Sequence, residues 1–193
     1  MKLYYSPKAC SLADHIALQE AGAKFVVERV NLATKRTAAG RDFNEINVKG
    51  CVPVIEMDDG AILTENVAIL DWIAAQYPTL GVSGEMGRTR LIESLTFIST
   101  ELHHSFRHLM DAKGDAEVAQ AKAGIQTRFH WISDTFKGDY LFGDHPSVAD
   151  CYLFVMTLWA ERFGVNVPTR LSSFKERMKG REAVKIALAV EAA

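Results

Sequence analysis

Cys10 is the residue in this chain whose type and position best suit chemistry, because it directly precedes a predicted helix. Ser6 and Pro7 end a short β-prone run, and from Ser11 onward apolar residues recur at helical spacing. The unpaired N–H groups and the dipole at a helix N-terminus favour an anion, and such a position can lower a cysteine pKa from about 8.5 to roughly 3.5–7.5. Lys8 adds a positive charge nearby. We therefore predict a reactive thiolate at Cys10.

The alternative is a small buried thiol with no chemistry, which is common among free cysteines. No second cysteine follows at Cys-x-x-Cys spacing, since the run is Cys10-Ser11-Leu12-Ala13. A dithiol mechanism within this loop is therefore excluded, and thiol chemistry needs an outside partner or a distant cysteine. The chain has 3 cysteines at wide spacing, which is no disulfide framework and suits a reducing compartment.

Length and composition narrow the class of protein. With 193 residues, 48% of them hydrophobic, the chain can form one large domain or two small ones around a substantial core. Its 22 basic and 24 acidic residues give a net charge of -2, so there is no polybasic signal for nucleic acid or an anionic membrane. The sequence opens in a strand, without a charged n-region or a long apolar run, which predicts a cytoplasmic protein.

The elements that must position Cys10 lie in the first part of the chain. The pattern predicts the order β-α-β-α-β-β-α, with strands near 3–5, 24–30, 50–57 and 61–63 and the clearest helices near 11–21 and 64–77. A strand-helix-strand connection of this length predicts parallel pairing of the first two strands. Residues 33–47 are polar and indicate a loop with one weak helix. Pro53 cannot donate to a sheet, so backbone near Val52-Pro53 is left for another use, and the bond between them can be cis.

The glycine-rich stretch 79–87 predicts a linker between an α/β domain at 1–78 and an all-helical domain at 88–193. The helices predicted for the second domain cover 88–112, 115–137, 148–163, 171–179 and 182–192. Ser147 is the expected N-cap of the most apolar of these helices, and Asp150 reaches back to it in a variant of the capping box. We favour this capping role for Asp150 over a catalytic one.

Together these features resemble the glutathione S-transferase family over essentially the whole chain. The features are a reactive residue at the first helix start, Val-Pro before a hairpin, a Thr-Glu-Asn helix start and a later Ser-Val-Ala-Asp. Four motifs resemble the bacterial beta class, which has cysteine where other classes use tyrosine or serine: Tyr4-Tyr5-Ser6-Pro7, Ala9-Cys10-Ser11-Leu12, Glu101-Leu102-His103 and Tyr140-Leu141-Phe142-Gly143. The resemblance implies a thioredoxin-like α/β domain followed by an all-α domain. The activity it implies is glutathione transfer to small electrophiles, glutathione-dependent thiol-disulfide exchange, or both.

The resemblance also implies roles for individual residues. The implied catalytic residues are Cys10, which would face the glutathione sulfur, and His103, which would line the site from the helical domain. The implied glutathione-binding residues are Lys35, Val52, Pro53, Glu65 and Asn66. The implied co-substrate pocket holds Tyr5, Phe106, Arg107, Met110 and Trp159. Without the resemblance, Lys35 is a solvated lysine and Glu65 an acid favoured by the helix dipole. The implied partners are glutathione, a small hydrophobic electrophile or disulfide, and a second copy of the chain in a homodimer.

Some positions depart from the beta-class pattern and keep a second function open. Lys8 stands where a small residue is common, so it either lowers the Cys10 pKa further or crowds the pocket. Cys51 replaces a common glutamine, and is either inert or able to resolve a mixed disulfide at Cys10. Asn66 replaces serine but keeps a hydrogen-bonding side chain. The alternative function is a carrier or regulatory module that binds glutathione or another ligand with little turnover.

Glu101, His104 and His108 have the spacing of metal ligands on one helix face. Because no other ligand cluster accompanies them, we interpret them as a solvated face, and we predict no metal. Glutathione is the expected co-substrate.

Overall fold

The first strand lies in the middle of a mixed sheet. In the computed structural model, which describes residues 1–192, β1 (Lys2–Tyr5) pairs in parallel with β2 (Val26–Asn31) and antiparallel with β4 (Val54–Glu56). β5 (Ile62–Thr64) extends one side and β3 (Arg36–Thr37) the other, giving the order β3-β2-β1-β4-β5. The predicted parallel pairing is confirmed. β3 was not predicted, because a two-residue strand in a polar loop carries no alternation to recognise.

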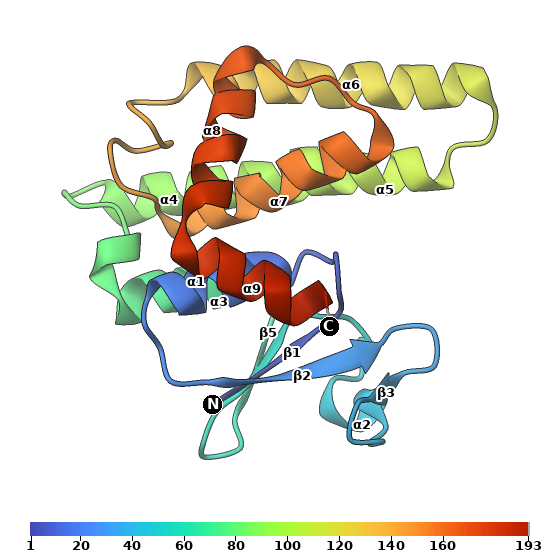
Figure 1. Ribbon diagram of the computed structural model, residues 1–193, viewed down its shortest axis with the longest axis vertical. Helices are drawn as coiled ribbons and strands as arrows, with labels where there is room; N and C mark the ends of the chain where they lie inside the picture. The colour runs from blue at the N-terminus through green and yellow to red at the C-terminus, as the bar shows by residue number, and fades with distance from the viewer. Residues whose placement is uncertain (193) are drawn as a thin grey trace.

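Both faces of the sheet are buried, as the alternation of side chains along a strand allows. The helices that cover it are α1 (Leu12–Glu20), α2 (Phe43–Ile46) and α3 (Asn66–Gln76). Leu3 and Ile55 belong to the large core shared with α1 and α3. Tyr4 and Val54 point to the opposite side, into a smaller cluster with Phe43 of α2. Figure 1 shows α1 and α3 between the sheet and the helices of residues 87–180.

The rest of the chain is helical, as predicted. After a short 3-10 turn (Pro78–Leu80), its helices are α4 (Gly87–Phe97), α5 (His104–Asp111), α6 (Asp115–Asp134), α7 (Val148–Phe163), α8 (Thr169–Gly180) and α9 (Glu182–Ala192). A π-helical turn (Ile98–His103) joins α4 to α5, so the single helix predicted over 88–112 contains one wider turn. Such turns occur often at functional sites. The predicted start and end of α7 agree with the structure.

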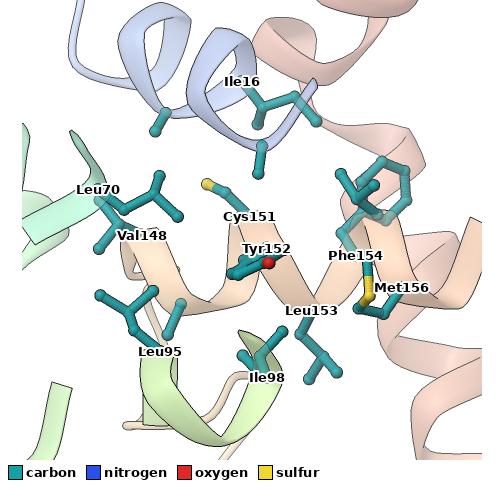
Figure 2. Packing of buried hydrophobic residues seen from close by; sticks show 14 of the residues in the cluster. Ile16, Leu70, Leu95, Ile98, Val148, Cys151, Tyr152, Leu153, Phe154 and Met156 are labelled. Carbon is teal, nitrogen blue, oxygen red and sulfur yellow. The ribbon is translucent and has the colours of Figure 1, made fainter. Parts of the chain in front are cut away.

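α7 is the central helix of the core, and its N-terminus is held by the predicted capping box. The Asp150 carboxylate accepts from the Ser147 N–H at 2.8 Å, the Ser147 hydroxyl at 2.7 Å and the Leu141 N–H at 2.9 Å. Burial raises the pKa of Asp150 to about 6. Figure 2 shows side chains of α7 packed between Ile16 of α1 and Ile98, the first residue of the π-helical turn. One continuous core therefore joins the sheet side of the molecule to the helical side.

α9 returns to the first helix and fixes the end of the described chain beside its beginning (Figure 1). Arg181, which precedes α9, forms a two-pronged ion pair with Glu20, and its Nη2–Oε2 distance is 2.8 Å. At the other end of α9, Glu191 Oε1 lies 3.1 Å from His15 Nδ1, and both side chains are buried. These two contacts hold α9 against α1, the helix that follows the Cys10 turn.

Within residues 1–192, no helix combines the length and apolar character needed to cross a membrane. The division of the chain at residues 79–87 stays a prediction.

Candidate active site

Cys10 lies in the turn between β1 and α1, on the side of the sheet that faces the helices. Its thiol is partly buried and donates to the carbonyl O of Val52, with an Sγ–O distance of 3.7 Å. The turn is held by the Ser11 hydroxyl, which accepts from the Ser6 N–H at 3.2 Å. Lys8 has a left-handed backbone, with φ of 64°, and this directs its side chain outward to an exposed position.

The predicted lowering of the Cys10 pKa is wrong for this structure. Burial of the thiol raises its pKa to about 12, and the nearby Asp14 carboxyl adds to the increase. The N–H groups of Cys10 and Ser11 lower the pKa, but they do not outweigh burial. The helix begins at Leu12, so Cys10 lies ahead of its first turn. Lys8 is exposed and lines a cleft on the α7 side, so water screens its charge from the thiol.

The Val52-Pro53 peptide bond is cis, as the sequence suggested. It precedes β4, and the Val52 carbonyl faces Cys10. Among residues 1–192, no group accepts a hydrogen bond from the Val52 N–H. The neighbouring loop is ordered by Asn47, whose side-chain amide donates to the Cys51 carbonyl at 2.8 Å. The segment thus offers a backbone donor and acceptor that belong to no strand.

Glu65 stands at the N-terminus of α3 with a left-handed backbone, φ of 75°. Such a conformation costs about 1–3 kcal/mol in a residue with a side chain and is concentrated at functional sites. Its exposed carboxylate accepts from Lys49 Nζ at 2.5 Å, and the same ammonium donates to the Thr64 hydroxyl at 2.7 Å. Lys49 was not predicted as a site residue, because a lysine in a polar loop looks like a solvated charge until the fold places it on Glu65.

Asn66 follows Glu65 and is buried, with its side chain directed toward α1. With the amide turned so that its nitrogen faces the acid, this nitrogen donates to both carboxyl oxygens of Asp14, at 3.1 and 2.8 Å. Asp14 is fully buried, and burial raises its pKa well above the ordinary value. The Asn66 side chain is therefore committed to the protein, and the N–H groups at the start of α3 are what this position offers a ligand. Asp14 was not predicted as a site residue. The signal that could have identified it is an acidic residue among the apolar residues of α1.

Lys35 lies across the same loop. Its backbone is left-handed, with φ of 54°, and its ammonium donates to the Gly50 carbonyl at 2.8 Å. Gly50 has φ of 61°, and a side chain there would press on the Lys35 ammonium at 3.3 Å. Lys35 and Lys49 therefore place two ammonium groups along the loop that leads into Val52-Pro53, while Glu65 places one carboxylate at its far side.

His103 reaches the site from the helical domain, at the end of the π-helical turn. Its Nδ1 lies 2.7 Å from the hydroxyl of Tyr152, and its ring packs edge-on against Trp159 with centroids 5.0 Å apart. Burial, together with the charges of Arg107 and His104, lowers the His103 pKa to about 4. The Trp159 indole N–H donates to the Lys8 carbonyl at 3.0 Å, so this aromatic pair connects the helical domain to the Cys10 turn. Tyr152 was not predicted, because it resembles any tyrosine in an apolar helix.

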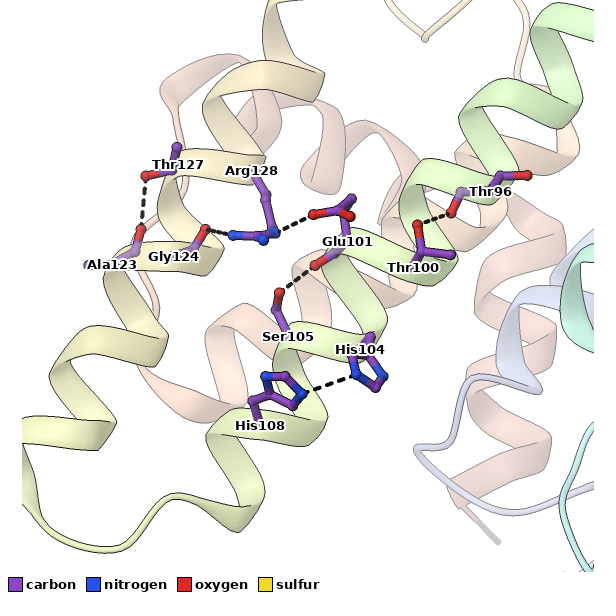
Figure 3. Close-up of polar contacts among 10 residues, drawn as sticks. All are labelled: Thr96, Thr100, Glu101, His104, Ser105, His108, Ala123, Gly124, Thr127 and Arg128. Carbon is purple, nitrogen blue, oxygen red and sulfur yellow. Dashed lines mark hydrogen bonds and ion pairs between the residues drawn. The ribbon is translucent and has the colours of Figure 1, made fainter.

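The next turn of this helix carries no metal site (Figure 3). Glu101 faces α6 and accepts from Arg128 Nε at 2.9 Å. His104 and His108 are neighbours, with Nε2 atoms 3.0 Å apart, but no third ligand joins them. Within residues 1–192 there is no cluster of three or more potential metal ligands.

The residues predicted for a co-substrate pocket are not all brought together. Trp159 lines a cleft of about 450 Å³ beside the Cys10 turn. Phe106 is fully buried in the core, against Phe129 and Trp159. Tyr5 is buried next to His15. The remaining two, Arg107 and Met110, are exposed on α5 and line none of the larger cavities found among the described residues.

The other two cysteines differ sharply in exposure. Cys151 is fully buried in α7, where burial raises its pKa and its thiol packs under Ile16 (Figure 2). Cys51 is exposed, and its thiol donates to the Lys49 carbonyl at 3.3 Å. Cys51 therefore presents its sulfur to solvent beside the Val52 backbone, whereas Cys151 is a core residue.

A sheet with a cis-proline turn beside a cysteine, followed by an all-helical domain, defines a thioredoxin-like protein with a helical C-terminal half. Family models agree: "Glutathione S-transferase, N-terminal domain" matches residues 9–76, and "Glutathione S-transferase, C-terminal domain" matches residues 94–182. The chain belongs to the glutathione S-transferase family.

Individual relatives cover nearly the whole chain. Glutathione S-transferase GstA of Escherichia coli O157:H7 is 35% identical, over 99% of this chain and 98% of its own. A sphingomonad glutathione S-transferase solved in complex with glutathione is 39% identical, with a TM-score of 0.90 over 100% of this chain and 99% of its own. The beta-class enzyme of Sphingomonas chungbukensis is 37% identical, with a TM-score of 0.87 over 99% and 98% of the two chains. The protein is thus a bacterial beta-class-like glutathione transferase with glutathione as its co-substrate.

Proposed function

We propose that this glutathione transferase holds the glutathione sulfur beside Cys10 and transfers it to small hydrophobic electrophiles. The observation that carries the proposal is the 3.7 Å contact between Cys10 Sγ and the Val52 carbonyl at the cis Val52-Pro53 bond. This contact sets a thiol against backbone groups that no strand uses. The glutathione complex of the sphingomonad relative, which has the same fold, supports this assignment.

The charges around this point fit a tripeptide with two carboxylates and one ammonium. Val52, ahead of Pro53, pairs its free N–H and its carbonyl with the cysteinyl unit. Glu65 takes the ammonium, in competition with Lys49, and the N–H groups at Asn66 hold the γ-glutamyl carboxylate. Lys35 takes the glycine carboxylate as a point charge.

Cys10 acts in this proposal as a neutral thiol, because its pKa lies far above neutrality. It donates its S–H to the sulfur of glutathione and favours the thiolate form of that sulfur. The thiolate attacks the electrophilic carbon, so a C–S bond forms while the leaving group departs with its electron pair. The thiol proton of glutathione passes to solvent. His103 contributes a neutral imidazole on the opposite side of the site.

The same burial argues against thiol-disulfide exchange through a mixed disulfide with Cys10, because that route requires the Cys10 thiolate as nucleophile. A direct test must therefore distinguish conjugation from two alternatives: an enzyme that catalyses disulfide exchange, and a carrier with little turnover.

The test compares Cys10→Ala and Cys10→Ser with the wild type, using 1-chloro-2,4-dinitrobenzene and the mixed disulfide of glutathione and 2-hydroxyethanethiol. If Cys10 is a donor, Cys10→Ala lowers kcat/KM for conjugation by about tenfold, the loss expected for one hydrogen bond to a charged group, and Cys10→Ser retains most of it. Disulfide exchange that is faster than conjugation and abolished in Cys10→Ser would contradict a donor role. Retention on immobilised glutathione without turnover of either substrate supports the carrier instead.

We also propose that the protein is a cytoplasmic homodimer. Support for a dimer comes from half-exposed Trp131 and Met86, at 55% and 53% exposure, which rim a cleft of about 660 Å³ between α4 and α6. Sedimentation equilibrium of the wild type and of Trp131→Lys tests this: a dimer that dissociates in the variant supports the proposal, and a wild-type monomer at micromolar concentration rejects it.

A further inference from the structure

A cleft of about 450 Å³ lies between the Cys10 turn, the C-terminal half of α7 and α9, and its floor is apolar. Leu12 and Val155 are 3% and 1% exposed, and Trp159 and Leu188 complete the apolar part. A cleft of this size can enclose a small organic molecule. The polar residues that line it are Lys8, Glu161, Arg162 and Glu191.

The two acids of the cleft are already paired. Glu161 Oε2 receives Lys175 Nζ at 3.0 Å, and Lys179 Nζ lies 3.6 Å away. Glu191 Oε1 lies 3.1 Å from His15 Nδ1. Two ammonium groups therefore balance the charge of Glu161, whereas Glu191 has a buried histidine as its partner.

The two cations of the cleft are not paired. Across the described part of the chain, no carboxylate lies within ion-pair distance of Lys8 or Arg162, and both side chains are exposed at the rim. The Arg162 guanidinium instead stacks near the Phe163 ring, 5.4 Å from its centroid. A positive rim above an apolar floor is complementary to an apolar molecule that ends in an anion.

The buried side of the cleft determines the orientation of the ligand. The Glu191 side chain is 4% exposed, and its Oε2 has no hydrogen-bond partner among residues 1–192. A buried carboxyl oxygen without a donor can accept a hydrogen bond from a ligand N–H or O–H, and it offers an anion no donor. The anionic end of a ligand must therefore lie at the rim, near Lys8 and Arg162, and the apolar body must lie below it.

We infer that this cleft binds amphipathic carboxylates, with the carboxylate between Lys8 and Arg162 and the apolar body on Leu12, Val155 and Trp159. The inference deepens the proposed function, on which it rests for the reaction, because Lys8 is close to Cys10 in the same turn. Cys10 itself does not line the cleft, so the link to the reaction is this shared turn, and carboxylated electrophiles are the substrate class that the cleft selects.

Binding is tested first without glutathione, so that it does not depend on turnover. The probes are 4-phenylbutyrate, 4-phenylbutanol and 4-phenylbutylamine, which share a body and differ in charge. The reporter is the NMR signal of the Trp159 indole N–H, which donates to the Lys8 carbonyl and is assigned by its loss in Trp159→Phe. The acid is expected to shift this signal and to bind at least several-fold more tightly than the alcohol, and the amine most weakly.

Charge removal supplies the decisive comparison. Lys8→Met and Arg162→Met are each expected to weaken binding of 4-phenylbutyrate by roughly three- to tenfold, the range for a partly exposed charge-assisted contact, and to leave 4-phenylbutanol unchanged. Lys24→Met removes one exposed positive charge outside the cleft and is expected to change neither affinity. Equal affinities for acid and amine, or an acid affinity that Lys24→Met reduces as much as Lys8→Met does, would overturn the inference.

The reaction is tested separately with 4-chloro-3,5-dinitrobenzoate and 1-chloro-2,4-dinitrobenzene. In Lys8→Met, the ratio of kcat/KM for the carboxylated substrate to kcat/KM for the neutral one is expected to fall several-fold. If neither substrate is turned over but 4-phenylbutyrate still binds, the proposed function is wrong and the inference that the cleft binds carboxylates still holds. If both are turned over with no effect of Lys8→Met on their ratio, the cleft does not select the substrate.

Discussion

The Tyr152 hydroxyl and His103 Nδ1 lie 2.7 Å apart, and this contact fixes which nitrogen of the imidazole carries its proton. Burial raises the pKa of Tyr152, so the tyrosine keeps its proton and donates it to Nδ1. The lowered pKa of His103 keeps the ring neutral, and a neutral ring that accepts at Nδ1 carries its proton at Nε2. The site therefore holds an uncharged imidazole N–H on the helical side.

Titration of His103 should show this directly. We expect the Nε2–H tautomer at pH 7 and a midpoint near pH 4, measured by NMR of the ring nitrogens. Tyr152→Phe removes the donor and is expected to mix the two tautomers. A midpoint at or above pH 6.5 would contradict the burial that the structure shows.

The same residue predicts a pH dependence of stability. The folded pKa of His103 lies below its unfolded value, so its contribution to stability is fully present above pH 6.5 and is lost as pH falls toward 4. The free energy of unfolding of the wild type relative to His103→Gln should fall by on the order of 2 kcal/mol across this window. Urea unfolding at several pH values measures it, and a difference that is constant with pH would contradict the prediction.

Asp150 predicts a dependence of the opposite sign. The pKa of Asp150 in the folded state, about 6, lies above its ordinary value of 3.8. Between pH 3.8 and pH 6 the folded state therefore keeps the Asp150 proton, whereas the unfolded state has lost it. The stability of the wild type relative to Asp150→Asn should therefore decrease as pH rises from 4 to 6 and stay level above that. Asp150→Ala removes the acceptor of three hydrogen bonds and is expected to cost about 2–4 kcal/mol at pH 7. Ser147→Ala, which loses one of them, is the milder control, at about 1 kcal/mol.

Cysteine labelling tests the burial of Cys10. At pH 7 we expect iodoacetamide to modify exposed Cys51 and to leave Cys10 almost untouched, with Cys10 labelling increasing through pH 10. Mass mapping of the wild type and of Cys51→Ser separates the two sites. Incubation with oxidised glutathione should likewise place any adduct on Cys51. Rapid labelling of Cys10 at pH 7 would restore the thiolate interpretation.

We predict that Asn66 stabilises the fold next to the Cys10 turn. Asn66→Ala leaves the buried Asp14 carboxyl without its donor and should lower the free energy of unfolding by about 1–3 kcal/mol. In Asn66→Ala with Asp14→Leu, both polar partners are gone, so part of this loss should be recovered. A double variant less stable than the sum of the single changes would show that the pair is not the main interaction of either side chain.

Much of the fold was predictable because its signals are local. Periodicity placed most helices, Ser147 and Asp150 identified the start of α7, and Pro53 identified a special backbone position. What the sequence could not show was burial. The Cys10 pKa depends on the surface that α3 and α7 cover, and the roles of Lys49 and Asp14 depend on partners distant in sequence. The predicted roles of Lys35 and Glu65 in binding glutathione stay predictions.

The contact between His15 and Glu191 joins residues 176 positions apart. During synthesis on the ribosome, α1 and the Cys10 turn emerge long before α9 exists to cover them. Until then, the apolar and acidic face of α1 has no α9 to pack against, and His15 has no carboxylate partner there. The Cys10 turn is thus synthesised early, and α9 covers the helix behind it only late, so a nascent chain arrested before α9 should expose α1 to chaperones or proteases.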